Sequence, residues 1–376
     1  SSFSTEWVSG NFHRDLRTQV APQLGGPFLE GEDALQIYDL FRFTNLPAVQ
    51  GELWGRWDDL ERLGVNAQIA VTNLVFRDAA FSRFATCVQF TNRFFNFSGI
   101  DIERGKERIT VPNAGIDLRR SRLYVTNVLS TMDPYVATGA IGPETRAAIE
   151  PYHFAKPPTV RLNGSIQLND ITTTDLHFEI VGGPFSYWKF NLPAVTGTVH
   201  WVTNTLSITN VQGDFYGGKL KWEGVFDFAK QTSTDFHFKG DFTDANMRLL
   251  MADLVSPTNK SEGILNGSLI ITAANSEDWK SWQGYGYVNL RDGFLWDVPM
   301  FGLFSPILNT IHPGLGSSRA SRGDATYTIT DSVIETKDLE ILEPTMRLRY
   351  EGKVDFDGVV NFRVEADLFR QTWVVG

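Results

Sequence analysis

The chain has 376 residues, of which 42% are hydrophobic and 13% aromatic, with 28 phenylalanines and 10 tryptophans. Its formal net charge is −10, which argues against a nucleic-acid partner. The single cysteine, Cys87, excludes an internal disulfide, and no apolar run of about 18 residues predicts a membrane-spanning helix. Because the chain begins without methionine and ends directly after a strand-like run, we expect it to be a piece of a longer protein.

Three helical patterns occur in chain order, and each precedes a glycine-rich strand pattern. The helical patterns cover residues 32–43, 143–152 and 244–254, and the glycine-rich segments that follow them cover residues 51–55, 161–164 and 263–267. A fourth helical pattern covers residues 304–311. This order predicts three repeated units, at residues 1–140, 141–242 and 243–376, of which the first is divergent and has a leading helix.

Alternation of apolar and polar residues dominates the rest of the chain. It is clearest in residues 160–168, 176–180, 195–201, 220–228, 348–356 and 362–368. Strict alternation is typical of antiparallel strands with one apolar face and one wet face. Residues 221–228 and 349–356 also share the order cation, aromatic, Glu, Gly, and both end on Asp-Phe. The segments Tyr216-Gly217-Gly218-Lys219 and Asp292-Gly293 predict hairpin turns.

The predicted helices are too few and too short to cover this much apolar strand surface. Either two sheets pack face to face around a dry core, or one sheet curls into a trough that holds another molecule. A lipid fits the trough, because burying one CH₂ group contributes about 0.8 kcal/mol and a long acyl chain on the order of 10 kcal/mol. The alternation leaves both solutions open. The candidate lipid-binding lining consists of Val199, Trp201, Leu206, Ile208, Leu220, Trp222, Phe226, Phe236, Phe238, Tyr350, Val354, Phe362 and Val364.

The chain shows no pattern typical of a catalytic or cofactor site. No two of its six histidines have the spacing of zinc ligands. A phosphate-binding glycine loop, a nucleophile elbow and a His-Glu-x-x-His motif do not occur. His177, His200 and His237 fall on the polar face of predicted strands and are expected to be solvated. We therefore expect a protein that is not an enzyme and that needs no metal or cofactor.

Two segments resemble the C-terminal region of the bacterial AsmA-like family. Residues 284–295 are similar to the family pattern G-x-G-x-v-x-l-x-d-G-x-l. Residues 192–228 are similar to a strand pattern with a central Tyr-Gly-Gly turn, and the matching positions are Leu206, Ile208, Val211, Gly213, Tyr216, Gly217, Gly218, Leu220, Gly224 and Asp227. The resemblance extends over about residues 155–368 and is looser over residues 28–130.

This resemblance implies an elongated, taco-like antiparallel β-groove with an apolar interior and short helices between repeat units. TamB-type proteins and eukaryotic bridge-like lipid-transfer proteins have a similar architecture. It implies a periplasmic body that is tethered to the inner membrane by an anchor outside these residues. The implied role is to carry phospholipid or another acyl-chain lipid in support of outer-membrane assembly or homeostasis. Membrane proteins that dock at the ends of the groove are further expected partners.

The alternative is a structural or adhesive β-repeat protein with a dry core and protein partners on its polar face. The two hypotheses differ in one observable feature of the apolar face. A lipid carrier leaves part of that face without protein cover, whereas a structural protein buries all of it.

Overall fold

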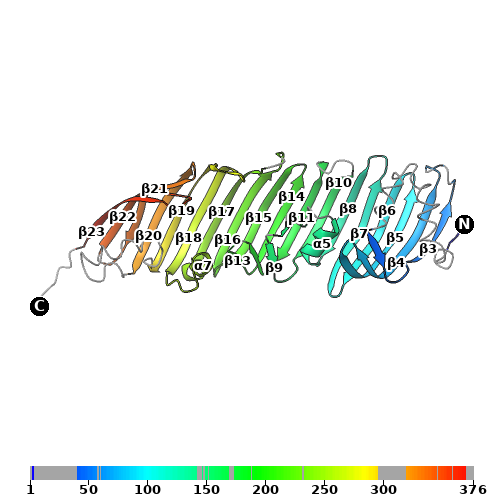
Figure 1. Cartoon of the computed structure of the whole chain (residues 1–376), viewed down its shortest axis with the longest axis horizontal. Helices are drawn as coiled ribbons and strands as arrows, with labels where there is room; N and C mark the ends of the chain where they lie inside the picture. Colours follow the sequence, from blue (N-terminus) through cyan, green and yellow to red (C-terminus); the bar gives the residue numbers. More distant parts are fainter. Residues whose placement is uncertain are drawn as a thin grey trace. The chain divides into compact units, whose positions relative to one another are not determined.

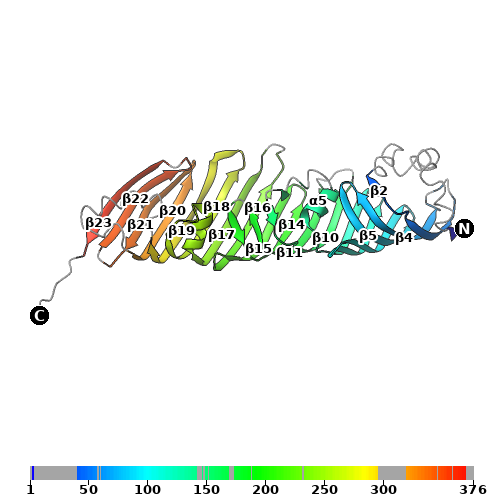
Figure 2. The ribbon, with the colours of Figure 1, turned by 60° about the horizontal axis from the view of Figure 1, so that its bottom comes forward.

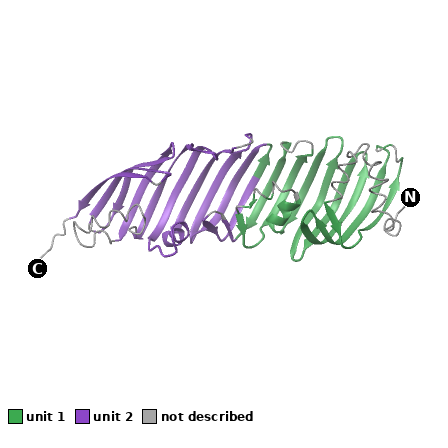
Figure 3. Ribbon diagram, in the orientation of Figure 1, with its two compact units in different colours: residues 1–183, 200–203 green, residues 184–199, 204–376 purple. Residues whose placement is uncertain are grey.

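The structure is a computed structural model that describes residues 2–3, 40–56, 59, 61–141, 146, 149–150, 152–168, 173–187, 189–230, 233–294, 319–344, 346–357 and 359–369. In this part of the chain the fold is mainly β with antiparallel strands, as the sequence predicts. Contacts divide the chain into two compact units (Figure 3). Unit 1 consists of residues 1–183 and 200–203, and unit 2 of residues 184–199 and 204–376. The three repeated units stay a prediction.

Unit 1 is an antiparallel meander (Figure 1). Its long strands are β3 (Ala48–Trp54), β4 (Gly64–Phe76), β5 (Ala79–Thr91), β6 (Phe94–Arg104), β7 (Glu107–Asp117), β8 (Arg122–Ser130), β10 (Thr159–Gln167) and β11 (Asp175–Gly182). Each pairs with the next of these strands along the chain. Two short strands, β1 (Ser2–Phe3) and β2 (Phe41–Phe43), pair with β3 and β4. Helix α5 (Pro134–Ile141) and strand β9 (Tyr152–Phe154) lie between β8 and β10 in sequence.

Unit 2 is also a meander in which consecutive strands pair. Its long strands are β15 (Thr205–Phe215), β16 (Gly218–Asp227), β17 (Asp235–Asn246), β18 (Glu262–Asn275), β19 (Asp278–Phe294), β20 (Ala320–Thr330), β21 (Val333–Leu342), β22 (Met346–Asp355) and β23 (Val360–Leu368). Strands β12 (Phe185–Tyr187) and β13 (Phe190–Leu192) form a separate hairpin. Strand β14 (Val195–Val202) begins in unit 2 and ends in unit 1. Helix α7 (Met247–Leu254) connects β17 to β18.

The register of unit 2 sorts apolar and charged residues onto opposite faces, because directly opposed residues point to the same side of a sheet. Ion pairs mark the polar face, for example Lys219 with Asp214 at 2.6 Å and Arg347 with Asp367 at 3.0 Å. Apolar residues and glycines mark the other face. One row of opposed residues crosses it from β15 to β23 and consists of Ile208, Gly224, Phe238, Ile271, Gly284, Ile329, Ile334, Val354 and Val360.

Helix α7 covers one end of this apolar face. The Asn246 side chain caps the helix by accepting a hydrogen bond from the backbone N–H of Leu249 at 3.2 Å. The helix contacts β13, β17 and β18, which lie beside it in Figure 1, and Figure 2 shows β17 and β18 from another side. Met247 and Leu250 are buried in the contact. The apolar face of unit 2 is therefore covered at the end where α7 lies.

Helix α5 has the same role in unit 1. The Asp133 carboxylate accepts a hydrogen bond from the backbone N–H of Tyr135 at 2.8 Å, and Pro134 occupies the first helical position. Val136 and Ala137 pack against a buried cluster of Val71, Leu74, Phe81 and Met132. The dipeptide Asp-Pro is a sequence signal for this helix start, although the sequence analysis placed a helix only further along the chain.

Three local predictions can be compared with the structure. The helix predicted at residues 244–254 is confirmed and begins three residues later, at Met247. The turn at residues 216–219 is confirmed, with Tyr216 at φ 48° and Gly217 at φ 84° between β15 and β16. The turn at Asp292-Gly293 is wrong, because both residues lie inside β19, where Arg291 and Gly293 pair with β20.

The helix predicted at residues 32–43 is wrong where the structure describes it, and the helix predicted at residues 143–152 is confirmed in part. Of residues 32–43, Phe41–Phe43 form strand β2, since Phe41 and Phe43 alternate toward the same apolar face as their partners Phe76 and Leu74. Of residues 143–152, Arg146 and Ile149 are helical as predicted, whereas Tyr152 begins strand β9. The other residues of the first pattern, most of the second, and all of the pattern at residues 304–311 lie outside the described part.

Two neighbouring leucines on α7 test how much the helix cover contributes to stability. Leu250→Ala removes a side chain that is 8% exposed and should lower the free energy of unfolding by about 2–4 kcal/mol. Leu249→Ala has the same helix propensity change, but Leu249 is 51% exposed, so the loss should stay within about 0.5 kcal/mol. Urea unfolding measures both variants. Equal losses would contradict the packing of α7 onto the sheet.

Candidate functional site

The apolar face of unit 2 is buried at the end where α7 lies, which we call the closed end. Its core contains Tyr216, Met247, Leu265, Leu348 and Tyr350, all at most 8% exposed. Leu348 is 0% exposed and Met346 next to it is also 0% exposed. This part of the face is therefore a protein core that other side chains cover.

The other end of the same face carries aromatic rings that are half-buried or exposed. This aromatic cluster consists of Trp222, Phe226, Phe236, Phe238, Trp279, Trp282 and Phe356. Neighbouring ring centroids are between 5.1 and 6.3 Å apart. Trp279 is 59% exposed and Phe356 37% exposed, and the other five are partly buried. Beneath the rings, Ile271, Ala274 and Ile329 are buried. The cluster is thus an apolar surface that packs on buried residues from below and is partly open to solvent above.

Register places the rings of β16 and β17 side by side. Phe226 lies opposite Phe236, and their rings stack with centroids 5.7 Å apart. Trp222 lies opposite Gly240, and its ring centroid is 6.0 Å from that of Phe238. The alternation of these two strands is therefore what brings the four rings onto one face.

Two glycines leave the room that the Trp222 indole occupies. A Cβ atom on Gly224 would lie 2.8 Å from the indole, and one on Gly240 would lie 3.2 Å from it. Gly224 follows Trp222 by two positions on β16, and Gly240 is opposite on β17. The indole therefore lies along the sheet surface, and the Glu-Gly of the repeated motif has a steric function here.

Rings from strands that are not neighbours also meet in the cluster. Trp279 and Trp282 come from β19, and Phe356 follows β22, so β20 and β21 lie between them. Three strand spacings of about 4.8 Å amount to roughly 14 Å. The ring of Phe356 is nevertheless 5.9 Å from Trp279 and 6.0 Å from Trp282, centroid to centroid. These side chains must lean toward one another across the apolar face.

The structure separates the predicted lining residues into three groups. Leu206, Ile208, Trp222, Phe226, Phe236 and Phe238 share the apolar face of β15, β16 and β17 at or beside the aromatic cluster. Tyr350 belongs to the core of the closed end, and Leu220, Phe362 and Val364 are partly buried against it. Val354 lies opposite Ile334 and Val360.

Strand β14 carries the last two predicted residues. Val199 is partly buried and belongs to unit 2. Trp201 belongs to unit 1, is 38% exposed, and donates its indole N–H to the carbonyl oxygen of Thr203 at 2.8 Å. Neither ring contacts nor register place these two residues in the aromatic cluster.

The sequence analysis missed Trp279, Trp282 and Phe356. Alternation along β19 places Trp282 on the apolar face. The next two positions on that face are Gly284 and Gly286, which interrupt the hydrophobic pattern. Phe356 is the last residue of the second cation-aromatic-Glu-Gly segment, so the repeat itself contained the signal. Trp279 is three positions before Trp282 and breaks the alternation.

The described residues contain few groups with the features of a reactive site. They include no group of three or more His, Cys, Asp or Glu side chains that could hold a metal ion. His200 is near Asp175, with Nε2 and Oδ1 3.0 Å apart, and both side chains are about half exposed. His177 contacts the His200 ring on the same polar surface of unit 1. None of the helices in this part of the chain has the length and hydropathy needed to cross a membrane.

The closed end holds two tyrosines whose pKa values are raised. Burial, and then the hydrogen bond to Asp253, raise the pKa of Tyr216 to about 12. Its hydroxyl donates to Asp253 Oδ2 at 2.8 Å and accepts from the backbone N–H of Asn191. Burial also raises the pKa of Tyr350, with a further contribution from the nearby Glu343 carboxylate. Both phenols are thus held in the neutral state by the folded core.

Tyr216 therefore makes stability fall at high pH. Its pKa is about 12 in the folded protein and about 10 in an unfolded chain, so its stabilising contribution is complete below pH 10. The contribution is lost as pH rises from about 10 to about 12, because the unfolded state releases the proton first. Tyr216→Phe should show a shallower fall of the unfolding free energy over this range, measured by urea unfolding. Equal slopes in both proteins would contradict this assignment.

No family model, curated protein or solved structure matches this chain. The resemblance to AsmA-like proteins therefore stays a prediction that depends on two motifs. The structure shows that the first motif, residues 192–228, ends in the hairpin of β15 and β16. The second, residues 284–295, lies in β19 as far as Phe294.

Proposed function

We propose that this protein is a non-enzymatic lipid-binding and lipid-transfer scaffold in which the aromatic cluster of unit 2 contacts acyl chains. The observation that carries the proposal is the contrast between the two ends of one apolar face. At the closed end, residues such as Leu348 are fully buried. At the other end, rings such as Trp222 and Trp279 remain accessible on the same face. Large exposed apolar patches on proteins mark sites of interaction.

Energetics favour an acyl chain as the ligand. Each CH₂ group that leaves water contributes about 0.8 kcal/mol, so ten such groups offset on the order of 8 kcal/mol of ordering cost. The cluster offers few polar groups that could orient a polar ligand. Aromatic rings such as Phe226 and Phe236 tolerate sliding contacts, since their attraction to a chain has little directionality. A flexible apolar chain therefore suits this surface better than a rigid polar molecule.

The leaning of Phe356 toward Trp279 supports a groove. Rings that meet over two intervening strands are expected where a sheet curves toward the face that carries them. We therefore propose that the apolar face of unit 2 forms a β-groove and that a lipid chain lies along it, across the strands.

The biological setting of the proposal follows the AsmA-like resemblance. We propose a periplasmic location, a tether to the inner membrane and membrane proteins that dock at the ends of the scaffold. The cargo would be phospholipid or another acyl-chain lipid, and the role would be to support outer-membrane assembly or homeostasis. The short motifs at residues 192–228 and 284–295 are the support for this setting.

The closed end supports the alternative hypothesis, a structural or adhesive β-repeat protein. Four predicted lining residues, Leu220, Tyr350, Phe362 and Val364, belong to or pack against a dry protein core. If the aromatic cluster were covered by a protein partner, the molecule would be the structural β-repeat protein of the second hypothesis. The two functions make opposite predictions for lipid content.

Lipid binding is tested with single substitutions on the two faces of unit 2. Trp222→Gln and Phe236→Gln each place a polar group in the aromatic cluster, and each should weaken binding of a fluorescent fatty acid about ten-fold, equivalent to about 1.4 kcal/mol. Tyr285→Gln is the matched control, because Tyr285 is an exposed ring, 51% accessible, on the polar face of β19. Native mass spectrometry of detergent-free protein, with lipid extraction, should show phospholipid in the control and less in the two variants.

Two results would count against the proposal. One is a purified protein of bare mass that binds no fatty acid, which is the result that the structural β-repeat protein predicts. The other is global unfolding of both Trp222→Gln and Phe236→Gln, detected by circular dichroism, which would identify the aromatic cluster as ordinary core.

A further inference from the structure

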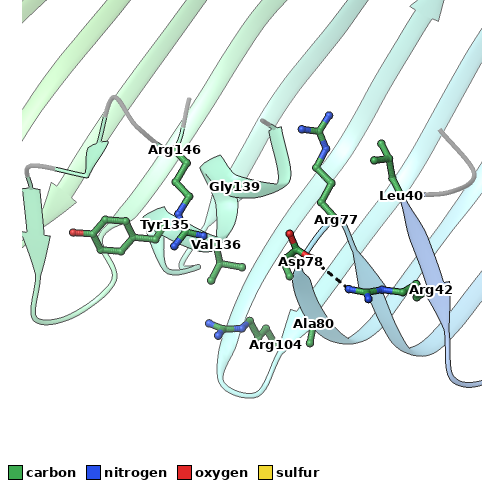
Figure 4. A pocket seen from close by; sticks show the side chains of 11 residues that line it. Leu40, Arg42, Arg77, Asp78, Ala80, Arg104, Tyr135, Val136, Gly139 and Arg146 are labelled. Carbon is green, nitrogen blue, oxygen red and sulfur yellow. Dashed lines mark hydrogen bonds and ion pairs between the residues drawn. The ribbon is translucent and has the colours of Figure 1, made fainter. Parts of the chain in front are cut away.

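Unit 1 contains a pocket of about 820 Å³ beside helix α5 (Figure 4). Its walls come from separate segments: Leu40 and Arg42 around β2, residues 77–80 of the β4–β5 turn, Arg104 at the end of β6, and Tyr135, Val136 and Gly139 of α5. Arg146 follows α5 and also lines it. The volume falls in the range of small-molecule sites.

The charge of this pocket is opposite to that of the whole chain. Four of the described lining residues are arginines and one is an aspartate, a formal excess of three positive charges. The chain as a whole carries −10. Figure 4 shows that the arginines Arg42, Arg77, Arg104 and Arg146 surround one opening. Composition alone does not explain this local excess.

Two of the four arginines are already paired. Arg42 contacts Asp78 at 3.4 Å, but the two side chains are 70% and 100% exposed, so this pair is weak and a stronger anion can displace it. Arg104 contacts Glu107 at 3.0 Å.

The other two arginines differ from these, and the guanidinium carbon of Arg77 lies over the Phe76 ring, 6.0 Å from its centroid. Neither Arg77 nor Arg146 makes an ion pair within the described part of the chain. The Nε atom of Arg77 is buried there without a hydrogen-bond acceptor, a state that costs free energy. Arg77 sits at φ 50°, where its backbone N–H donates to the Leu40 carbonyl oxygen at 2.7 Å. The backbone thus fixes the base of this side chain at the pocket.

One wall of the pocket is apolar. Val136 and Ala79 line it and also pack against the buried cluster that contains Val71 and Phe81. The pocket therefore combines guanidinium donors with an apolar surface. Guanidinium groups bind phosphate oxygens through paired N–H donors, and they favour phosphate over weaker anions.

From these features we infer that the arginine pocket of unit 1 binds a phosphate-bearing group, and that this group is the headgroup of an amphiphile. The phosphate accepts hydrogen bonds from Arg77 and Arg146, and the glycerol and first chain carbons lie along Val136. The amphiphile as the source of the phosphate rests on the proposed lipid function. The phosphate chemistry rests on the arginines alone.

The test compares two probes on the purified full chain by isothermal titration calorimetry: dihexanoyl phosphatidic acid, which is soluble, and glycerol 3-phosphate. The double variant Arg77→Gln with Arg146→Gln should bind the phosphatidic acid at least about ten-fold more weakly. The control, Arg120→Gln with Arg161→Gln, removes the same charge from exposed positions of unit 1 and should bind as the unaltered protein does.

Each outcome has a defined meaning. An equal loss in the pocket and control variants, or no loss in either, would overturn the phosphate site. Equal affinity for glycerol 3-phosphate and phosphatidic acid would overturn the amphiphile and leave soluble phosphate as the ligand. The pocket variant should keep its fatty-acid binding, whereas Trp222→Gln should keep its glycerol-phosphate binding. A failure of the acyl-chain proposal is therefore visible separately from a failure of the pocket.

Discussion

Long strands that carry most of their apolar side chains on one face must keep that face out of water, and the features of unit 2 depend on how it does so. The described residues cover it at one end of the strands with helix α7, which is eight residues long, and with the β12–β13 hairpin, whose Phe190 packs against the same core. At this end of the strands the face is a core, in which Met346 and Leu348 of β22 are 0% exposed. At the other end the chain places rings, which shield one another and the aliphatic residues beneath them.

The aromatic cluster and the arginine pocket belong to different units, and each combines elements distant in sequence. In unit 2, the meander brings β16 and β17 together, and side-chain reach brings Phe356 to Trp279 of β19 although β20 and β21 lie between them. In unit 1, the pocket arises because α5 packs against the cluster beside the β4–β5 turn, so that Val136 and Ala79 line the same pocket.

Much of the strand framework could be predicted from the sequence, because period-two alternation depends on local geometry. The strand over residues 220–228 and the helix over residues 244–254 are examples, since each has its own apolar periodicity. The open and closed ends could not be predicted in this way. Tyr350 and Trp222 occupy equivalent positions of the repeated motif. Tyr350 is nevertheless 2% exposed and Trp222 half-buried, because side chains distant in sequence cover Tyr350 more completely than they cover Trp222. The arginine pocket was likewise invisible, because Arg77, Arg104 and Arg146 come from three segments with no shared motif.

The strictly sequential pairing of β15 to β23 also limits how such a unit can evolve. Successive connections between strands alternate between the two ends of the strands. The Tyr216 turn and α7 therefore lie at one end, and the turn after β16 lies at the other. Insertion of a whole hairpin would lengthen the unit by about 10 Å and leave every later connection at its own end. Insertion of a single strand would move the later connections to opposite ends, and a helix in one of them would then lie over the aromatic rings. Length can therefore change freely only in steps of two strands.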